Sequence, residues 1–319
     1  MKSAGIAILR RLDARGGWLL VVLMLLGLAL TRPSLPLQKD VFNAIVVVDI
    51  SQSMNTLDYR IGEITTSRLQ AVKNTLNDSL RQIPCGSKIG LAIFTEYRSF
   101  LLLAPIEVCA NYAELSTSIS QISGKMAWAG GSEVAKGLNW GLKMAVTIEP
   151  KPALVFFTDG HEAPPISLRN RPRIDVKAGQ VQGLLVGVGG DELTPIPKFD
   201  PDGNPLGYWR ADEVAQIDIY SQGRAGSVSG EKMADADSTV ASDAKTRTEH
   251  LSSLKEGYLR KLAGETGLSY ARLTSPSDLS VLLSQARLGQ QHRVPVPVGW
   301  LPALLALTVL VICYLWRVR

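Results

Sequence analysis

An unbroken apolar run, residues 44–48, is followed directly by three oxygen-bearing side chains at alternate positions, Asp49, Ser51 and Ser53. A β-branched run of this kind is typical of a buried strand in a parallel sheet. The polar residues then lie at the carboxyl end of the strand, where open α/β sheets bind ligands. One carboxylate and two hydroxyls are therefore expected to converge there, a donor set suited to Mg²⁺, Ca²⁺ or Mn²⁺. The alternative is a polar turn that caps the next helix.

Two further oxygen donors follow the same logic. Asp159 comes after a second buried strand expected over 153–157, and Ser132 lies in a glycine-rich loop that opens a helix. Taken singly, Asp159 is equally explained as a turn residue and Ser132 as a helix N-cap. Because loops at the carboxyl ends of parallel strands meet at one edge of the sheet, we expect one divalent-cation site, with Mg²⁺ as the first candidate. Its predicted ligands are Asp49, Ser51, Ser53, Ser132 and Asp159.

Strand and helix patterns alternate along the central part of the chain. Strands are expected over 44–48, 153–157, 181–188 and 268–273, and helices over 67–83, 112–122, 132–149, 251–262 and 276–288. This alternation predicts an α/β fold with a doubly wound, mostly parallel sheet and one antiparallel edge strand. Residues 191–250 interrupt it with proline-rich and then Ser-, Gly- and Asp-rich sequence, which predicts an exposed insertion, disordered over 221–250.

The cysteines predict one disulfide bond. Strands expected over 88–94 and 100–104 form a hairpin around Tyr97, and Cys85 and Cys109 each lie twelve residues from that tyrosine. They should therefore face one another across the open end of the hairpin, close enough to bridge. Two free thiols are the alternative. Cys313 is expected to fill apolar space, and no Cys-x-x-Cys spacing indicates redox chemistry.

Both ends of the chain are apolar and flanked by basic residues. The segments 16–31 and 298–316 are predicted to cross a membrane, the first as a signal anchor or, alternatively, a cleaved signal peptide. The basic tails 1–15 and 317–319 then lie in the cytoplasm and the main domain on the opposite side of the membrane. That domain is expected over 43–290, joined to the membrane by linkers 32–42 and 291–297.

The net charge of +5 comes from the tails. Of the 34 Lys and Arg residues, six lie in the two tails, together with one of the 29 acidic residues, which leaves 28 of each sign between them. A balanced domain of this kind gives no support to nucleic-acid binding.

The three loops resemble a known motif. Asp49-Ile-Ser51-Gln-Ser53, Gly131-Ser132 and Thr158-Asp159-Gly160 are similar to the metal-ion-dependent adhesion site of von Willebrand factor A domains. The resemblance implies that Ser51, Ser53 and Ser132 hold the cation, with Asp49 and Asp159 ligating directly or through water. Ser132 stands where that family usually has threonine, which keeps the hydroxyl but removes a methyl group.

A closer resemblance is to membrane-anchored bacterial proteins of the Bat type, and within them to the MxaL group that accompanies methanol dehydrogenase. It rests on four blocks, residues 84–90, 94–105, 127–137 and 195–203. This resemblance implies that the membrane is a bacterial inner membrane and that the main domain lies in the periplasm. It also implies an accessory role in the assembly of periplasmic methanol dehydrogenase or in the insertion of its Ca²⁺.

Binding is the function that the site chemistry favours. A cation held mainly by neutral hydroxyls keeps much of its charge, so an acidic residue of a protein partner can complete its shell. No Ser–His–Asp arrangement or phosphate-binding loop predicts catalysis, so we expect no enzyme activity. A metal-dependent hydrolase or phosphotransfer enzyme and a structural membrane subunit remain the alternatives. His161 and Glu162 are expected to be solvated loop residues, whereas Trp128 is equally explained as a contact residue or by packing.

Overall fold

The structure is a computed structural model that describes residues 14–61, 64–127, 130–165, 172–200, 202–214, 248–274 and 279–315. Most of the insertion expected to be disordered, and Trp128, lie outside these residues. The chain divides into two compact units, one formed by Val41–Gln290 and the other by the two ends of the chain.

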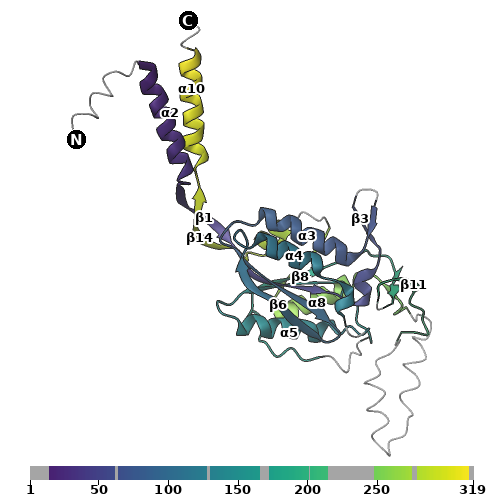
Figure 1. Cartoon of the computed structure of the whole chain (residues 1–319). Helices are drawn as coiled ribbons and strands as arrows, with labels where there is room; N and C mark the ends of the chain where they lie inside the picture. Colours follow the sequence, from purple (N-terminus) through teal and green to yellow (C-terminus); the bar gives the residue numbers. More distant parts are fainter. Residues whose placement is uncertain are drawn as a thin grey trace, which may run out of the picture. The chain divides into compact units, whose positions relative to one another are not determined.

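The larger unit is built on a six-stranded sheet (Figure 1). In spatial order its strands are β13 (Ser269–Arg272), β8 (Gly183–Gly187), β7 (Ala153–Thr158), β2 (Asn43–Asp49), β5 (Lys88–Thr95) and β6 (Arg98–Glu107). Neighbouring strands run parallel except β6, which pairs with β5 in the antiparallel direction, as the hairpin predicted. β2 lies inside the sheet and is almost fully buried, which explains its continuous apolar sequence.

Helices cover both faces of this sheet (Figure 1). One face carries α3 (Arg68–Gln82), α4 (Tyr112–Gln121) and α9 (Leu279–Gln285), and the other carries α5 (Val134–Thr147) and α8 (Glu256–Thr266). The predicted start of α3 is confirmed, since the hydroxyl of Ser67 accepts a hydrogen bond from the Gln70 amide at 3.2 Å. The expected doubly wound α/β fold is therefore present.

Several short elements lie in the loops outside the sheet. The loop after β2 contains a 3₁₀ turn, η1 (Gln52–Asn55), and a small hairpin of β3 (Tyr59–Ile61) and β4 (Ile64–Thr66). A second 3₁₀ turn, η2 (Gly124–Met126), follows α4. The described ends of the insertion form two small antiparallel pairs, β9 (Thr194–Pro195) with β12 (Leu251–Ser252), and β10 (Pro197–Phe199) with β11 (Pro205–Tyr208).

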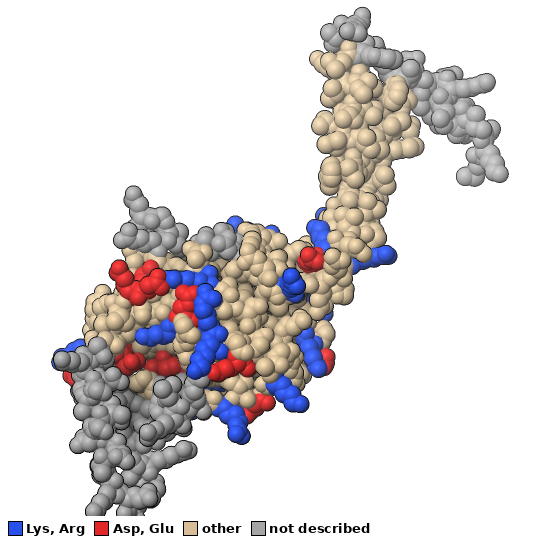
Figure 2. Space-filling model, turned by 180° about the vertical axis from the view of Figure 1, so that it is seen from behind, with Lys and Arg blue, Asp and Glu red and all other residues tan. Residues whose placement is uncertain are grey.

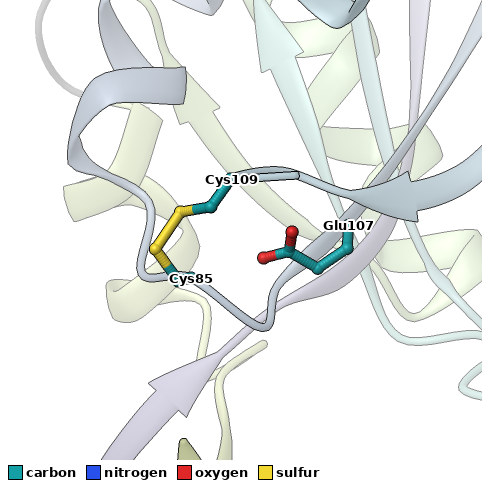
Figure 3. Close-up of side chains that lie close together, drawn as sticks. All are labelled: Cys85, Glu107 and Cys109. Carbon is teal, nitrogen blue, oxygen red and sulfur yellow. A yellow bond between two sulfur atoms is a disulfide. The ribbon is translucent and has the colours of Figure 1, made fainter. Parts of the chain in front are cut away.

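The predicted disulfide is confirmed. The sulfur atoms of Cys85 and Cys109 are bonded, and the Cα atoms lie 5.2 Å apart at the open end of the β5–β6 hairpin (Figure 3). Glu107 lies beside this bond because its carboxylate accepts hydrogen bonds from the amides of Gly86 and Ala110, each at 2.6 Å. The sulfurs are oxidised, so this cluster offers no thiolate to a metal and is structural.

Replacing both cysteines by serine should lower the free energy of unfolding by about 3–4 kcal/mol, the value expected for a cross-link of this loop length. Chemical denaturation under non-reducing conditions measures it, with Cys313→Ser as the matched control because Cys313 is free. A double variant as stable as the parent would show that the disulfide does not constrain the unfolded chain.

The second unit contains the ends of the chain. It holds α2 (Ala14–Leu30), α10 (Trp300–Leu315) and two paired strands, β1 (Ser34–Val41) and β14 (Gln290–Pro297). The segments expected as linkers thus contain strands. No helix among the described residues is both long and apolar enough to cross a membrane, so the two predicted spans are not supported.

Candidate functional site

The register of the sheet brings the first and third predicted loops together. Val48 of β2 is paired with Phe157 of β7, so the next residues, Asp49 and Thr158, lie side by side at the carboxyl edge. The Thr158 hydroxyl donates to Oδ2 of Asp49 at 2.6 Å, and the Ser51 amide donates to Oδ1 at 2.8 Å. Asp49 is fully buried. Both oxygens of this carboxylate are therefore held in fixed positions below the loop.

The side chains of Ser51, Ser53 and Ser132, which come from two loops, line one pocket near Asp49. Ser51 Oγ and Ser53 Oγ are 3.3 Å apart in the loop after β2. Ser132 reaches the same pocket because its backbone exchanges two hydrogen bonds with Ala163, at 2.7 and 2.8 Å. The Ser132 hydroxyl is buried and has no hydrogen-bond partner. The pocket has a volume of about 240 Å³.

Asp159 is also fully buried, but its carboxylate is engaged by other groups. Its Oδ2 accepts from Nη1 of Arg68 at 2.5 Å and from the Ser252 hydroxyl at 3.0 Å, and its Oδ1 accepts from the His161 amide at 2.9 Å. Arg68 is buried as well and forms a second ion pair with Asp58, Nη2 to Oδ2, at 2.7 Å. The sequence did not predict this arginine.

Burial and charge give the two aspartates opposite pKa shifts. Burial, together with the nearby charge of Asp159, raises the pKa of Asp49 to about 7. Burial alone would also raise the pKa of Asp159, but the guanidinium of Arg68 brings it below its usual value. Asp159 is therefore the charged member of the pair, and its charge is offset inside the protein.

Glu162 holds the helix that follows the Ser132 loop. Its carboxylate accepts from the amides of Val134 and Ala135 at 3.0 and 3.1 Å, at the N-terminus of α5. The Tyr258 hydroxyl donates to it at 2.5 Å. Glu162 was predicted to be a solvated loop residue, and this prediction is wrong because the side chain is only 9% exposed. Its carboxylate oxygens instead accept hydrogen bonds from the free amides at a buried helix N-terminus. Ser132 is not the N-cap, because α5 begins at Val134 after Glu133.

Glu162→Gln should flatten the pH dependence of stability. Burial raises the pKa of Glu162 from 4.5 to about 7, so the folded protein keeps a proton that the unfolded chain has lost. The contribution of Glu162 to the free energy of unfolding is fully present below pH 4.5. As the pH rises to about 7 this contribution is lost, which lowers the free energy of unfolding by on the order of 3 kcal/mol. Denaturation in chelator at pH 5 and pH 8 measures the difference. The exposed Glu114→Gln is the control, and an unchanged slope in Glu162→Gln would contradict the assignment.

His161 is likewise buried rather than solvated. Its side chain is 3% exposed and lines the pocket, and neither ring nitrogen forms a hydrogen bond. Burial lowers the pKa of His161, although the charge of Asp159 acts in the other direction. The imidazole is therefore neutral at pH 7 and faces the same space as the three hydroxyls. Since the sequence gives this histidine no ligand spacing, only the tertiary structure reveals its place.

These observations show how well the predicted ligands fit a divalent cation. The unpartnered Ser132 hydroxyl, with Ser51 and Ser53 in the same pocket, provides three hard oxygen donors that fit such an ion. Asp49, whose carboxylate accepts from the Ser51 amide, is an acidic group beside this loop that could hold a ligated water. Asp159 is less suited to ligate the cation directly, because its Oδ2 already accepts hydrogen bonds from Arg68 and Ser252.

Comparison with known proteins agrees with this fold. Residues 44–161 match the family model of the von Willebrand factor type A domain. No curated protein matches the chain. A structure of an aerotolerance-related membrane protein from Bacteroides fragilis is similar at 17% identity, over 77% of this chain and 98% of that chain, with a TM-score of 0.47. A von Willebrand factor type A structure from Catenulispora acidiphila is 13% identical over 80% of this chain and 43% of that chain, with a TM-score of 0.39.

The family match begins within β2 and ends after β7, so it includes all three loops from Asp49 to Asp159. The structural likenesses are too distant to carry an argument about function. Residues 44–161 therefore form the core of a von Willebrand factor type A-like α/β domain.

Proposed function

We propose that this chain is a membrane-attached binding factor that docks a protein partner through a divalent cation. The observation that carries the proposal is the Ser132 hydroxyl, which is buried without a partner and lines one pocket with Ser51 and Ser53. A buried hydroxyl normally has a hydrogen-bond partner, so this arrangement favours a bound ligand. We propose Mg²⁺ as that ligand, with Ca²⁺ or Mn²⁺ as alternatives of the same hard-donor preference.

The charges around the pocket favour a divalent cation, which can in turn bind an anion. Arg68 offsets the charge of Asp159, which leaves Asp49 as the uncompensated carboxylate beside the three hydroxyls. When bound, the divalent cation supplies a centre of net positive charge that attracts a further oxygen ligand. We propose that a carboxylate of the partner takes that place. Catalysis has less support, because neither ring nitrogen of His161 forms a hydrogen bond that would activate a serine.

Attachment to a membrane is supported by the surface of α2 and α10. The described part of both helices beyond Arg15 carries no charged residue, and no blue or red atoms lie along it (Figure 2). Large apolar side chains are exposed there, among them Leu23, Leu30, Leu307 and Ile312. An apolar surface of this extent marks a membrane or protein contact. We propose the bacterial inner membrane as its site.

A periplasmic position of the larger unit is supported by the Cys85–Cys109 bond, since disulfides persist in oxidising compartments. Basic residues outside both apolar segments support the same orientation. As the partner we propose periplasmic methanol dehydrogenase, for which this chain would assist assembly or Ca²⁺ insertion. The support is the resemblance of the four sequence blocks to the MxaL group.

Capture of purified methanol dehydrogenase by the full chain tests this proposal. We expect capture in Mg²⁺, at least a hundredfold less in EDTA, and an equal loss in Asp49→Ala, with the exposed Asp78→Ala as the matched control. Capture that survives both EDTA and Asp49→Ala would show that the metal site does not bind the partner. No capture by the parent chain in Mg²⁺ would exclude methanol dehydrogenase as the partner.

A further inference from the structure

The pocket extends from the three hydroxyls to the insertion. Its remaining wall includes residues from both described ends of that insertion, namely Ile196, Trp209, Glu213, Val214 and Glu249. The insertion is held in place there because β9 pairs with β12, and the Ser252 hydroxyl donates to Asp159 at 3.0 Å. The sheet loops and the insertion thus build one site.

Trp209 presents a hydrogen-bond donor that no described group uses. Its indole Nε1 is buried and has no partner, although an indole N–H can only donate. The ring is firmly placed, because the Trp209 amide donates to the Ile196 carbonyl at 3.0 Å and Nζ of Lys198 lies 4.6 Å from the ring centroid. Trp209 lines the pocket, and a donor without a partner at such a place is suited to an acceptor on a ligand.

His161 adds a second unused polar group to the same pocket. Oε2 of Glu249 lies 3.7 Å from Nε2 of His161, which is too far for a hydrogen bond. Ser132, His161 and Trp209 therefore line the pocket from three different loops, and together they carry four buried polar atoms without a partner. Buried polar groups are almost always hydrogen-bonded, so these four atoms favour a bound ligand.

The charge of the wall narrows the chemistry of the ligand. No Lys or Arg among the described residues lines the pocket, and the acidic Glu213 is paired with Lys198 at 2.6 Å. Ile196, Ala163 and Pro164 make part of the wall apolar. The pocket is smaller than a typical drug-sized site. Because the wall also contains Glu249, only the proposed cation can attract a carboxylate here, and the apolar part of the wall suits a short apolar stem.

We propose that Trp209 and His161 form a recognition subsite that binds the main chain next to the partner's acidic residue. The carboxylate lies toward Ser51, Ser53 and Ser132, and the adjacent peptide carbonyl accepts from the indole N–H of Trp209. This inference rests on the proposed function. The ligand is then an acidic residue within a peptide chain. The insertion, through Trp209, distinguishes such a peptide from a free carboxylate.

Two probes test this with the full chain, N-acetylglutamate methylamide, which has peptide carbonyls, and propionate, which has only the carboxylate. The indole resonances of chain labelled with ¹⁵N-tryptophan are followed in Mg²⁺, and the Trp209 signal is assigned by its loss in Trp209→Phe. We expect that signal to shift with the peptide probe in Mg²⁺. The peptide probe should bind at least tenfold more tightly than propionate, and Trp209→Phe should remove that advantage without changing Mg²⁺ affinity.

The exposed Trp300→Phe in α10 is the matched control and should keep the preference. If Mg²⁺ binds normally but Trp209→Phe retains the preference, or the parent has none, the subsite is overturned while the proposed function stands. If the parent chain binds no Mg²⁺, the proposed function fails and the subsite fails with it. Equal binding of the peptide probe in EDTA would also overturn the inference.

Discussion

Replacing Arg68 by methionine should lower the free energy of unfolding by about 3–5 kcal/mol. The guanidinium is fully buried and pairs with Asp159 at 2.5 Å and Asp58 at 2.7 Å, so its removal leaves two carboxylates without a cation in a poorly solvated interior. Breaking a buried pair by removing one partner has this cost because an uncompensated charge remains. The effect exceeds that of any surface charge, where ion pairs contribute about 1 kcal/mol or less.

Equilibrium denaturation in chelator measures the effect of Arg68→Met without a contribution from metal. Arg81→Met is the matched control, because Arg81 is exposed on the same helix and hydrogen-bonds only to the Tyr112 hydroxyl among the contacts that the structure describes. It should change stability by less than about 1 kcal/mol. An Arg68 variant as stable as the Arg81 variant would show that Asp159 does not depend on this guanidinium.

Asp49→Asn should weaken binding of Mg²⁺ at least a hundredfold. The side-chain oxygen of asparagine can still accept from the Ser51 amide, and its NH2 group can donate to the Thr158 hydroxyl oxygen, so the loop is expected to fold, but the negative charge beside the hydroxyls is lost. Supporting groups around a metal change affinity by about 10- to 100-fold, and a charged group in the site should lie at or beyond the upper end. Isothermal titration calorimetry measures the affinity, with Asp78→Asn as the control.

The pH dependence of this binding follows from Asp49. Since its pKa is about 7, a cation must displace a proton below that pH, and the affinity of the parent chain should fall about tenfold for each pH unit. Asp49→Asn should remove this dependence. An affinity in the parent chain that does not change between pH 5 and pH 7 would contradict the role of Asp49.

The central fold was predictable because short stretches of the sequence indicate its strands and helices. The buried run before Asp49 and the helix start at Ser67 can each be recognised within a short segment, and the structure has both. The Cys85–Cys109 bond followed from symmetric spacing around one turn. By contrast, β1 and β14 have mixed polar sequences and pair across almost the whole chain, so no local periodicity indicates them.

The buried polar groups around the site were not predictable for the same reason. Arg68 is 91 residues from Asp159 and 184 from Ser252, and an arginine in the first turn of a helix usually faces solvent. Glu162 caps α5 from 27 and 28 residues away, so no capping pattern appears in the sequence before that helix. The side chains of the three motif loops were visible in the sequence, whereas the groups that hold them depend on tertiary contacts.

Binding of Mn²⁺, followed by electron paramagnetic resonance, is the most direct measurement of the central claim, because the free ion and the bound ion are distinguished in one titration. We expect one bound ion per chain, displaced by Mg²⁺ and lost when Ser51 and Ser53 are both replaced by alanine. A parent chain that binds no Mn²⁺, or a double variant that still binds one ion with the same affinity, would contradict it.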